Sequence, residues 1–123
     1  MAGSRPLFDL FQSRVVQSRS EVALDFGKQC VTYGELLVRV EDLADRISSQ
    51  HGGAPSRVLI GCAKSPALFE AYLACCLLDA TVVPVEPELP EPRVRELIEL
   101  SGCTYALRTA SSAIEAAASD LPT

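Results

Sequence analysis

Few side chains in this sequence have the type and spacing that catalysis or phosphate binding needs. The only lysines are Lys28 and Lys64, and the only histidine is His51. Neither lysine follows a glycine-rich loop, so the sequence holds no P-loop, whose amides and lysine cradle phosphates, and no GxGxxG dinucleotide fingerprint. It also lacks a GxSxG nucleophile elbow, and His51 stands before Gly52 and Gly53, where a turn is expected. A histidine base would therefore have no evident partner.

Two other groups of residues could bind a ligand. Ser65 precedes Pro66 at an expected helix start, where free helix amides could hold an anion, but a plain N-cap accounts for it better. Glu86, Glu88 and Glu91 lie in a proline-rich segment and could suggest a metal. A solvated loop, with an acid near the positive end of the next helix, is the simpler interpretation. Residue chemistry alone gives no complete active site.

The cysteines are odd in number and contain no CxxC pair; they are Cys30, Cys62, Cys75, Cys76 and Cys103. Most of them lie in apolar runs, which predicts small buried residues in a reducing compartment rather than disulfides. With a single histidine, a zinc site has almost no ligands to draw on.

The composition is that of one globular domain at most. The chain has 123 residues, of which 48% are hydrophobic and 22% charged. Its net charge is −5, with the cationic residues scattered among the acids. A nucleic-acid partner is not expected, because nucleic-acid binders usually present a basic face.

No membrane span is expected. The one apolar candidate, residues 66–85, contains Glu70 and Asp79 and has Pro84 near its end; a helix followed by a strand explains it without a bilayer. The first twenty residues have several arginines and serines, as a mitochondrial presequence does, but Asp9 counts against one. We expect a cytoplasmic protein rather than a mitochondrial one.

Hydrophobic periodicity and turn residues predict helices that alternate with strands. The order is a helix at Leu7–Ser20, a hairpin of Glu21–Phe26 and Cys30–Thr32, a helix from Thr32 to about His51, a strand at Arg57–Ala63, a helix from Ser65 to about Leu78, a strand at Thr81–Val85, a helix from Glu91 to Gly102 and a strand at Thr104–Arg108. Such alternation predicts an α/β fold, a mostly parallel sheet flanked on both faces by helices. Residues 1–6 are expected to be flexible, and residues 111–123 to form a helix or a tail.

The clearest local signals lie at the start of the longest helix and around the prolines. Thr32 and Glu35 have the spacing of a capping box, in which each side chain satisfies an orphan amide of the first turn. Val82, Val83 and Val85 are expected in a central strand, where Pro84 should stop the pairing because it has no amide. Pro87 and Pro90 should keep the following loop extended.

Two segments resemble the N-terminal part of the adenylate-forming ligases: acyl-CoA synthetases, luciferases and the adenylation domains of nonribosomal peptide synthetases. The first segment, VTYGEL at residues 31–36, matches a Leu/Val-Thr-Tyr-x-Glu-Leu motif of that family. The second, CLLDATVVPVEPELPEPR at residues 76–93, matches its proline-rich motif. The matching positions are Thr32, Tyr33, Glu35, Leu36, Val83, Pro84, Val85, Pro87, Pro90 and Arg93.

The second segment also departs from that motif at three positions. Asp79 stands for the family's glycine, Val82 for its tyrosine and Glu86 for its aspartate. An aspartate there must adopt the backbone angle that the glycine took, which Asp tolerates better than most residues. These substitutions suggest a divergent branch, such as the one that activates β-alanine or aminoadipate.

The resemblance implies that residues 7–110 form a partial AMP-binding domain, its N-terminal subdomain. The family joins a carboxylic acid to ATP as an acyl-adenylate and passes the acyl group to a pantetheine thiol, with Mg²⁺. Its phosphate loop, its ribose-binding Asp and its late catalytic Lys have no match here. We therefore assign no catalytic, cofactor-binding or metal residue, and no cofactor, to this chain itself; ATP, Mg²⁺ and phosphopantetheine belong to the whole enzyme.

Two interpretations follow from this resemblance. The chain is expected to be an N-terminal fragment or truncated form of such a ligase, inactive alone, whose partner is the remaining part of the enzyme. The alternative is a stand-alone binding or regulatory module that pairs with a partner chain or competes with the full enzyme.

Overall fold

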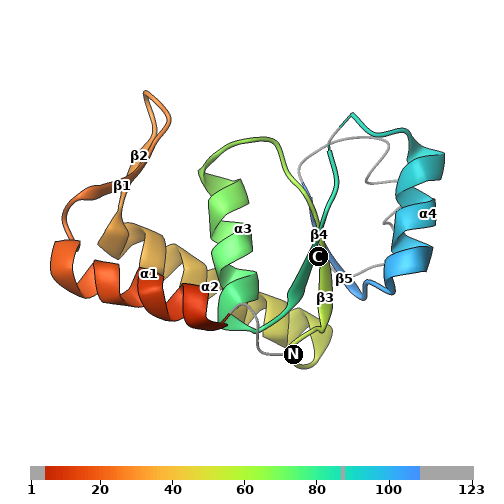
Figure 1. The fold of residues 1–123 in the computed structure, drawn as a ribbon, viewed down its shortest axis with the longest axis horizontal. Helices are drawn as coiled ribbons and strands as arrows, with labels where there is room; N and C mark the ends of the chain where they lie inside the picture. The colour runs from red at the N-terminus through yellow and green to blue at the C-terminus, as the bar shows by residue number, and fades with distance from the viewer. Residues whose placement is uncertain (1–4, 87, 109–123) are drawn as a thin grey trace.

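The computed structural model describes residues 5–86 and 88–108 and confirms the expected order of elements (Figure 1). The elements are α1 (Arg5–Ser18), β1 (Val22–Asp25), β2 (Cys30–Thr32), α2 (Tyr33–His51), β3 (Arg57–Gly61), α3 (Pro66–Leu77), β4 (Thr81–Pro84), α4 (Glu91–Ser101) and β5 (Tyr105–Arg108). Pro87 and the possible helix at residues 111–119 lie outside the described residues.

Three parallel strands form the main sheet in the order β4-β3-β5. Successive side chains of β3 point to opposite faces, as the strand period requires. Val58 and Ile60 join the core cluster that contains α2 and α3 side chains, whereas Leu59 joins the cluster of α4. Figure 1 accordingly shows α2 and α3 on one side of the sheet and α4 on the other. The predicted α/β fold, with helices on both faces, is confirmed.

Helix α4 is held by a small second core. Val94 is fully buried against this face, together with Leu59 and Ala106 of the sheet. Burial of a valine side chain contributes about 2 kcal/mol. Gly102, with φ +71°, ends the helix in the left-handed conformation that the sequence predicts for it.

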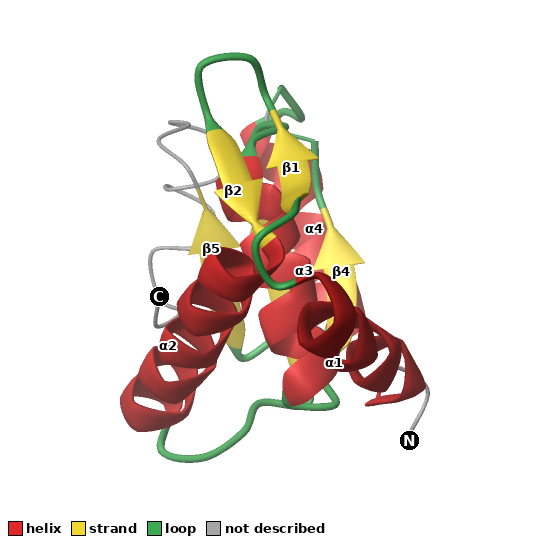
Figure 2. Ribbon diagram, turned by 90° about the vertical axis from the view of Figure 1, so that its left-hand side faces the viewer, coloured by secondary structure: helices red, strands yellow, loops and turns green. Residues whose placement is uncertain are grey.

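The β1–β2 hairpin is a separate antiparallel ribbon beside α1 and α2 (Figure 2). Gly27 in its turn has φ +76°, in the left-handed region that favours glycine. Phe26 packs against Phe69 of α3 with ring centroids 5.9 Å apart, so the hairpin contacts the helices through this pair. Phe8 of α1 is 1% exposed and belongs to the same core cluster as the buried side chains of α2 and α3.

The prediction of a central strand for Val82, Val83 and Val85 is wrong for the described residues, where β3 is central and β4 lies at the edge. Pairing also continues past Pro84, because the amide of Val85 donates to the carbonyl of Ile60 at 2.9 Å. Alternate residues of a strand bond to the same neighbour. The missing amide of Pro84 therefore faces the outer edge, where a proline is tolerated.

Three smaller expectations are corrected. Ser65 is the N-cap of α3 by position, but its side chain makes no cap hydrogen bond; Oγ lies 3.0 Å from the carbonyl oxygen of Ala63 and donates to it. His51 is the last residue of α2 rather than a turn residue. Cys30 is exposed, because the edge of the two-stranded hairpin leaves it outside the core.

Candidate functional site

The first motif segment, residues 31–36, builds the start of α2. Glu35 donates its amide to Oγ1 of Thr32 at 3.2 Å, and the amide of Thr32 donates to Oε1 of Glu35 at 2.9 Å. The predicted capping box is therefore confirmed. The hydrogen bond from the backbone amide of Thr32, and then the bonding of the Thr32 side chain, lower the pKa of the Glu35 carboxyl below its ordinary value. The Glu35 carboxylate therefore caps the start of α2.

The apolar positions of this segment join the hairpin and α1 to α2. Leu36 is 2% exposed and lies in the main core. The half-buried ring of Tyr33 lies against Phe11 of α1, with centroids 6.4 Å apart. Both side chains therefore have structural roles in the described fold.

The second motif segment shapes the exit from β4. Val83 is partly buried beside the α4 core, Val85 is 6% exposed, and Pro84 is exposed between them. The chain leaves the sheet immediately after these residues, and Pro87, the next motif position, lies outside the described residues.

The last two motif positions belong to α4. Pro90 is its N-cap, with the extended angles φ −60° and ψ 147°. Arg93 is exposed and forms an ion pair with Glu96 one turn along the helix.

The two motif segments are not brought together into one site. The first packs with α1 and the hairpin on one side of the sheet, and the second leads into α4 on the other side (Figure 1). The sequence motifs therefore coincide with helix starts and strand exits. That these positions carry no catalysis remains a prediction.

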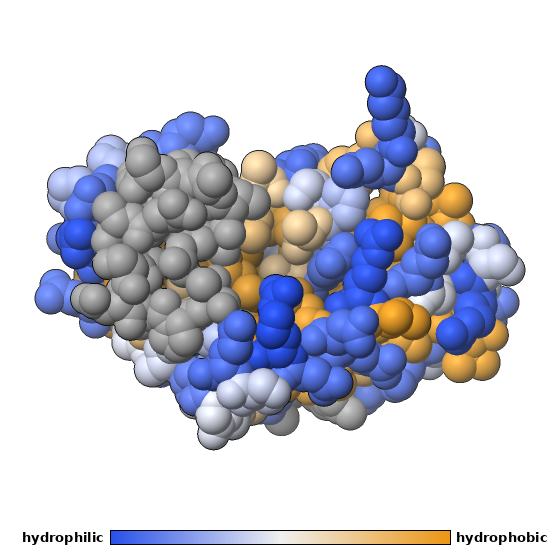
Figure 3. Space-filling model, turned by 180° about the vertical axis from the view of Figure 1, so that it is seen from behind, coloured by the Kyte–Doolittle hydropathy of each residue, from blue (hydrophilic) through white to orange (hydrophobic). Residues whose placement is uncertain are grey.

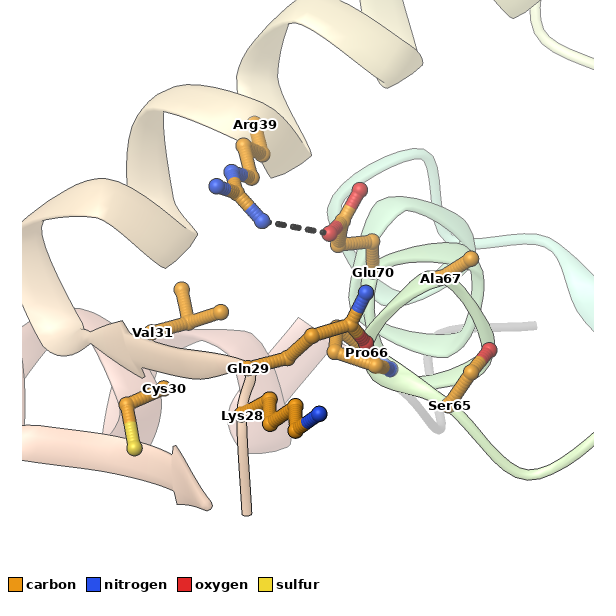
Figure 4. Close-up of a pocket in the computed structure, with 9 residues that line it drawn as sticks. All are labelled: Lys28, Gln29, Cys30, Val31, Arg39, Ser65, Pro66, Ala67 and Glu70. Carbon is orange, nitrogen blue, oxygen red and sulfur yellow. Dashed lines mark hydrogen bonds and ion pairs between the residues drawn. The ribbon is translucent and has the colours of Figure 1, made fainter. Parts of the chain in front are cut away.

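A polar groove lies between the hairpin, α2 and the start of α3, with a volume of about 440 Å³ (Figure 4). Lys28 and Gln29 of the hairpin turn face the start of α3 across it. Arg39 of α2 pairs with Glu70 of α3, at 3.4 Å between Nη1 and Oε2. Glu70 therefore places a carboxylate beside the arginine, and Lys28 is the other cation of the groove.

A second groove, of about 490 Å³, opens at the carboxyl ends of β3 and β4. It is mostly apolar, with one charge of each sign; its residues are Ile60, Cys62, Lys64, Leu68, Tyr72, Pro84, Val85 and Glu86. Sequence reasoning missed this groove, because its residues come from three separate segments. The predicted parallel sheet could have indicated its location, because proteins with such sheets usually bind ligands at the carboxyl ends of the strands.

Candidate nucleophiles and metal ligands do not form a reactive cluster in the described part of the chain. Residues 5–86 and 88–108 contain no group of three or more His, Cys, Asp or Glu placed to hold a metal ion. Burial, and then the neighbouring Cys76, raises the pKa of the Cys75 thiol to about 12. Desolvation, and then the Asp25 carboxylate, raises the pKa of the exposed Cys30 thiol. Neither thiol is an activated nucleophile, which would need a lowered pKa.

His51 is used structurally at the end of α2. Its Nδ1 lies 3.1 Å from the carbonyl oxygen of Gly53, and its Nε2 lies 2.9 Å from Oγ1 of Thr104. The neighbouring Tyr105 hydroxyl donates to Oε1 of Gln50 at 2.5 Å. These bonds fasten α2 to the segment that enters β5.

Comparison with known proteins gives the family. A model described as AMP-binding enzyme matches residues 11–123. The chain belongs to the AMP-binding enzyme family. The resemblance seen in the two motif segments is confirmed at the level of the superfamily.

Curated relatives include long synthetases and a shorter ligase. Malpibaldin synthetase of Mortierella alpina is 33% identical over 93 residues, which are 76% of this chain and 2% of the relative. The 2-succinylbenzoate–CoA ligase of Escherichia coli (strain K12) is 33% identical over 92 residues, 74% of this chain and 20% of that enzyme. The chain thus spans a small part of the curated relatives that it matches.

A solved structure gives the same fold. The N-terminal subdomain of Klebsiella oxytoca NpsA, in complex with 3-hydroxyanthranilyl-AMSN, matches with a TM-score of 0.80 and 26% identity, over 88% of this chain and 28% of that one. The described α/β unit therefore corresponds to part of the N-terminal subdomain of an adenylation domain.

Within residues 5–86 and 88–108, none of the helices combines the length and hydropathy of a membrane span; residues 66–85 form α3, a turn and β4.

Proposed function

We propose that this chain is the N-terminal scaffold of an ATP-dependent ligase that activates a carboxylic acid. The observation that carries the proposal is the family match over residues 11–123. The structure is in keeping with it, because the motif residues Thr32, Glu35 and Pro90 are used to start helices. Residues with such roles support an active site rather than form one.

In the proposed reaction of the whole enzyme, a carboxylate oxygen of the acid attacks the α-phosphorus of ATP. Pyrophosphate leaves, and the acyl-adenylate keeps the AMP. The sulfur of a pantetheine thiol then attacks the acyl carbon, AMP leaves, and the thiol proton passes to the medium. Mg²⁺ would neutralise the phosphate oxygens during the first step.

The 123-residue chain is proposed to be inactive alone. The proposal is supported by the family's phosphate loop and late catalytic lysine, which have no match in the sequence, and by the carboxylate that lines each groove, Glu70 in one and Glu86 in the other. The test is acid-dependent exchange of pyrophosphate into ATP, with the E. coli 2-succinylbenzoate–CoA ligase as the positive control. Exchange above background by the purified chain, with any acid, would refute the proposed inactivity.

The branch that activates β-alanine or aminoadipate is our narrower proposal. It rests on the three departures from the family motif, at Asp79, Val82 and Glu86. An antibody against residues 7–20 would isolate the parent protein for exchange assays with these two acids and with proteinogenic amino acids. Exchange only with proteinogenic amino acids would exclude the branch.

The second candidate function is a stand-alone module that pairs with another chain or competes with the full enzyme. The observation that favours it is the open apolar groove at the carboxyl ends of β3 and β4. The same antibody distinguishes the two proposals by mass. A species several times heavier than 13.2 kDa supports the ligase fragment, and a dominant 13.2 kDa species supports the module. Fractionation of the same cells would test the cytoplasmic location that we propose.

A further inference from the structure

We draw no further inference here: the strongest candidate, the polar groove between the hairpin, α2 and the start of α3, is lined by charges of both signs in Lys28, Arg39 and Glu70 and nothing in the structure shows which ligand it would take, while the apolar patches on the face seen in Figure 3 lie scattered among charged side chains with nothing to show what covers them.

Discussion

The amide nitrogen of Gly34 lies 2.9 Å from the carbonyl oxygen of Arg19, so that the first turn of α2 is bonded to the residue that follows α1. A Cβ atom at Gly34 would lie 2.7 Å from Cγ of Arg19 and 3.2 Å from its carbonyl oxygen. The glycine thus permits a close backbone approach inside the first family motif.

Substitution of Gly34 by alanine should therefore destabilise the chain. Overpacking usually costs about 1–3 kcal/mol, and the better helix propensity of alanine returns at most about 1 kcal/mol. We expect G34A to lower the free energy of unfolding by about 1 kcal/mol in urea denaturation. R19A should recover part of this loss in the double variant, because it removes the clashing Cγ. Equal stability of G34A and the wild type would contradict the close contact.

The capping box should make stability depend on pH in acid. The folded pKa of Glu35 is below its ordinary value of 4.5, so its charged form is favoured in the folded state. The stabilisation is complete above about pH 4.5 and is lost as the pH falls through the folded pKa, since the unfolded carboxyl is protonated first. E35Q keeps an acceptor for the Thr32 amide and removes this dependence.

The measurement is urea denaturation of wild type and E35Q from pH 7 to pH 2.5. The stability difference between them should shrink or reverse toward low pH. E41Q, at an exposed position of the same helix, serves as the control. A difference that does not vary with pH would exclude the charged capping box.

Asp79 has the left-handed backbone conformation that we expected because it stands where the family motif has a glycine. It has φ +56°, and no other described residue except glycine has a positive φ. The left-handed conformation costs about 1–2 kcal/mol for ordinary L-residues and less for Asp. D79V should lower the free energy of unfolding by about 1–2 kcal/mol, and D79G should not lower it by more than about 0.5 kcal/mol. Equal loss in both variants would point instead to a side-chain contact of Asp79.

The cysteines should differ in reactivity according to burial. At pH 8, a thiol with a pKa of about 12, as in Cys75, is ionised in about one molecule in ten thousand. A maleimide reagent should label the exposed Cys30 first and leave Cys75, Cys76 and Cys103 unmodified until denaturant is added. Mass spectrometry of tryptic peptides reads the order. Early labelling of Cys75 would show that α3 is not packed on the sheet.

Local signals in the sequence determined the elements and their boundaries. The capping box at Thr32 and Glu35, the glycine at Gly102 and the apolar periodicity of each helix and strand are short-range patterns. Each depends on residues only a few positions apart in the chain. They also carried the family resemblance, because motifs at helix starts and strand exits are contiguous in the chain.

Only the tertiary structure decided the order of the strands and the location of the grooves. The sequence does not distinguish a central strand from an edge strand when both are short and apolar, so the edge position of β4 became clear only from its pairing with β3. The groove beside Tyr72 joins residues of β3, α3 and the exit of β4. Its existence depends on how these segments pack, which no local pattern encodes.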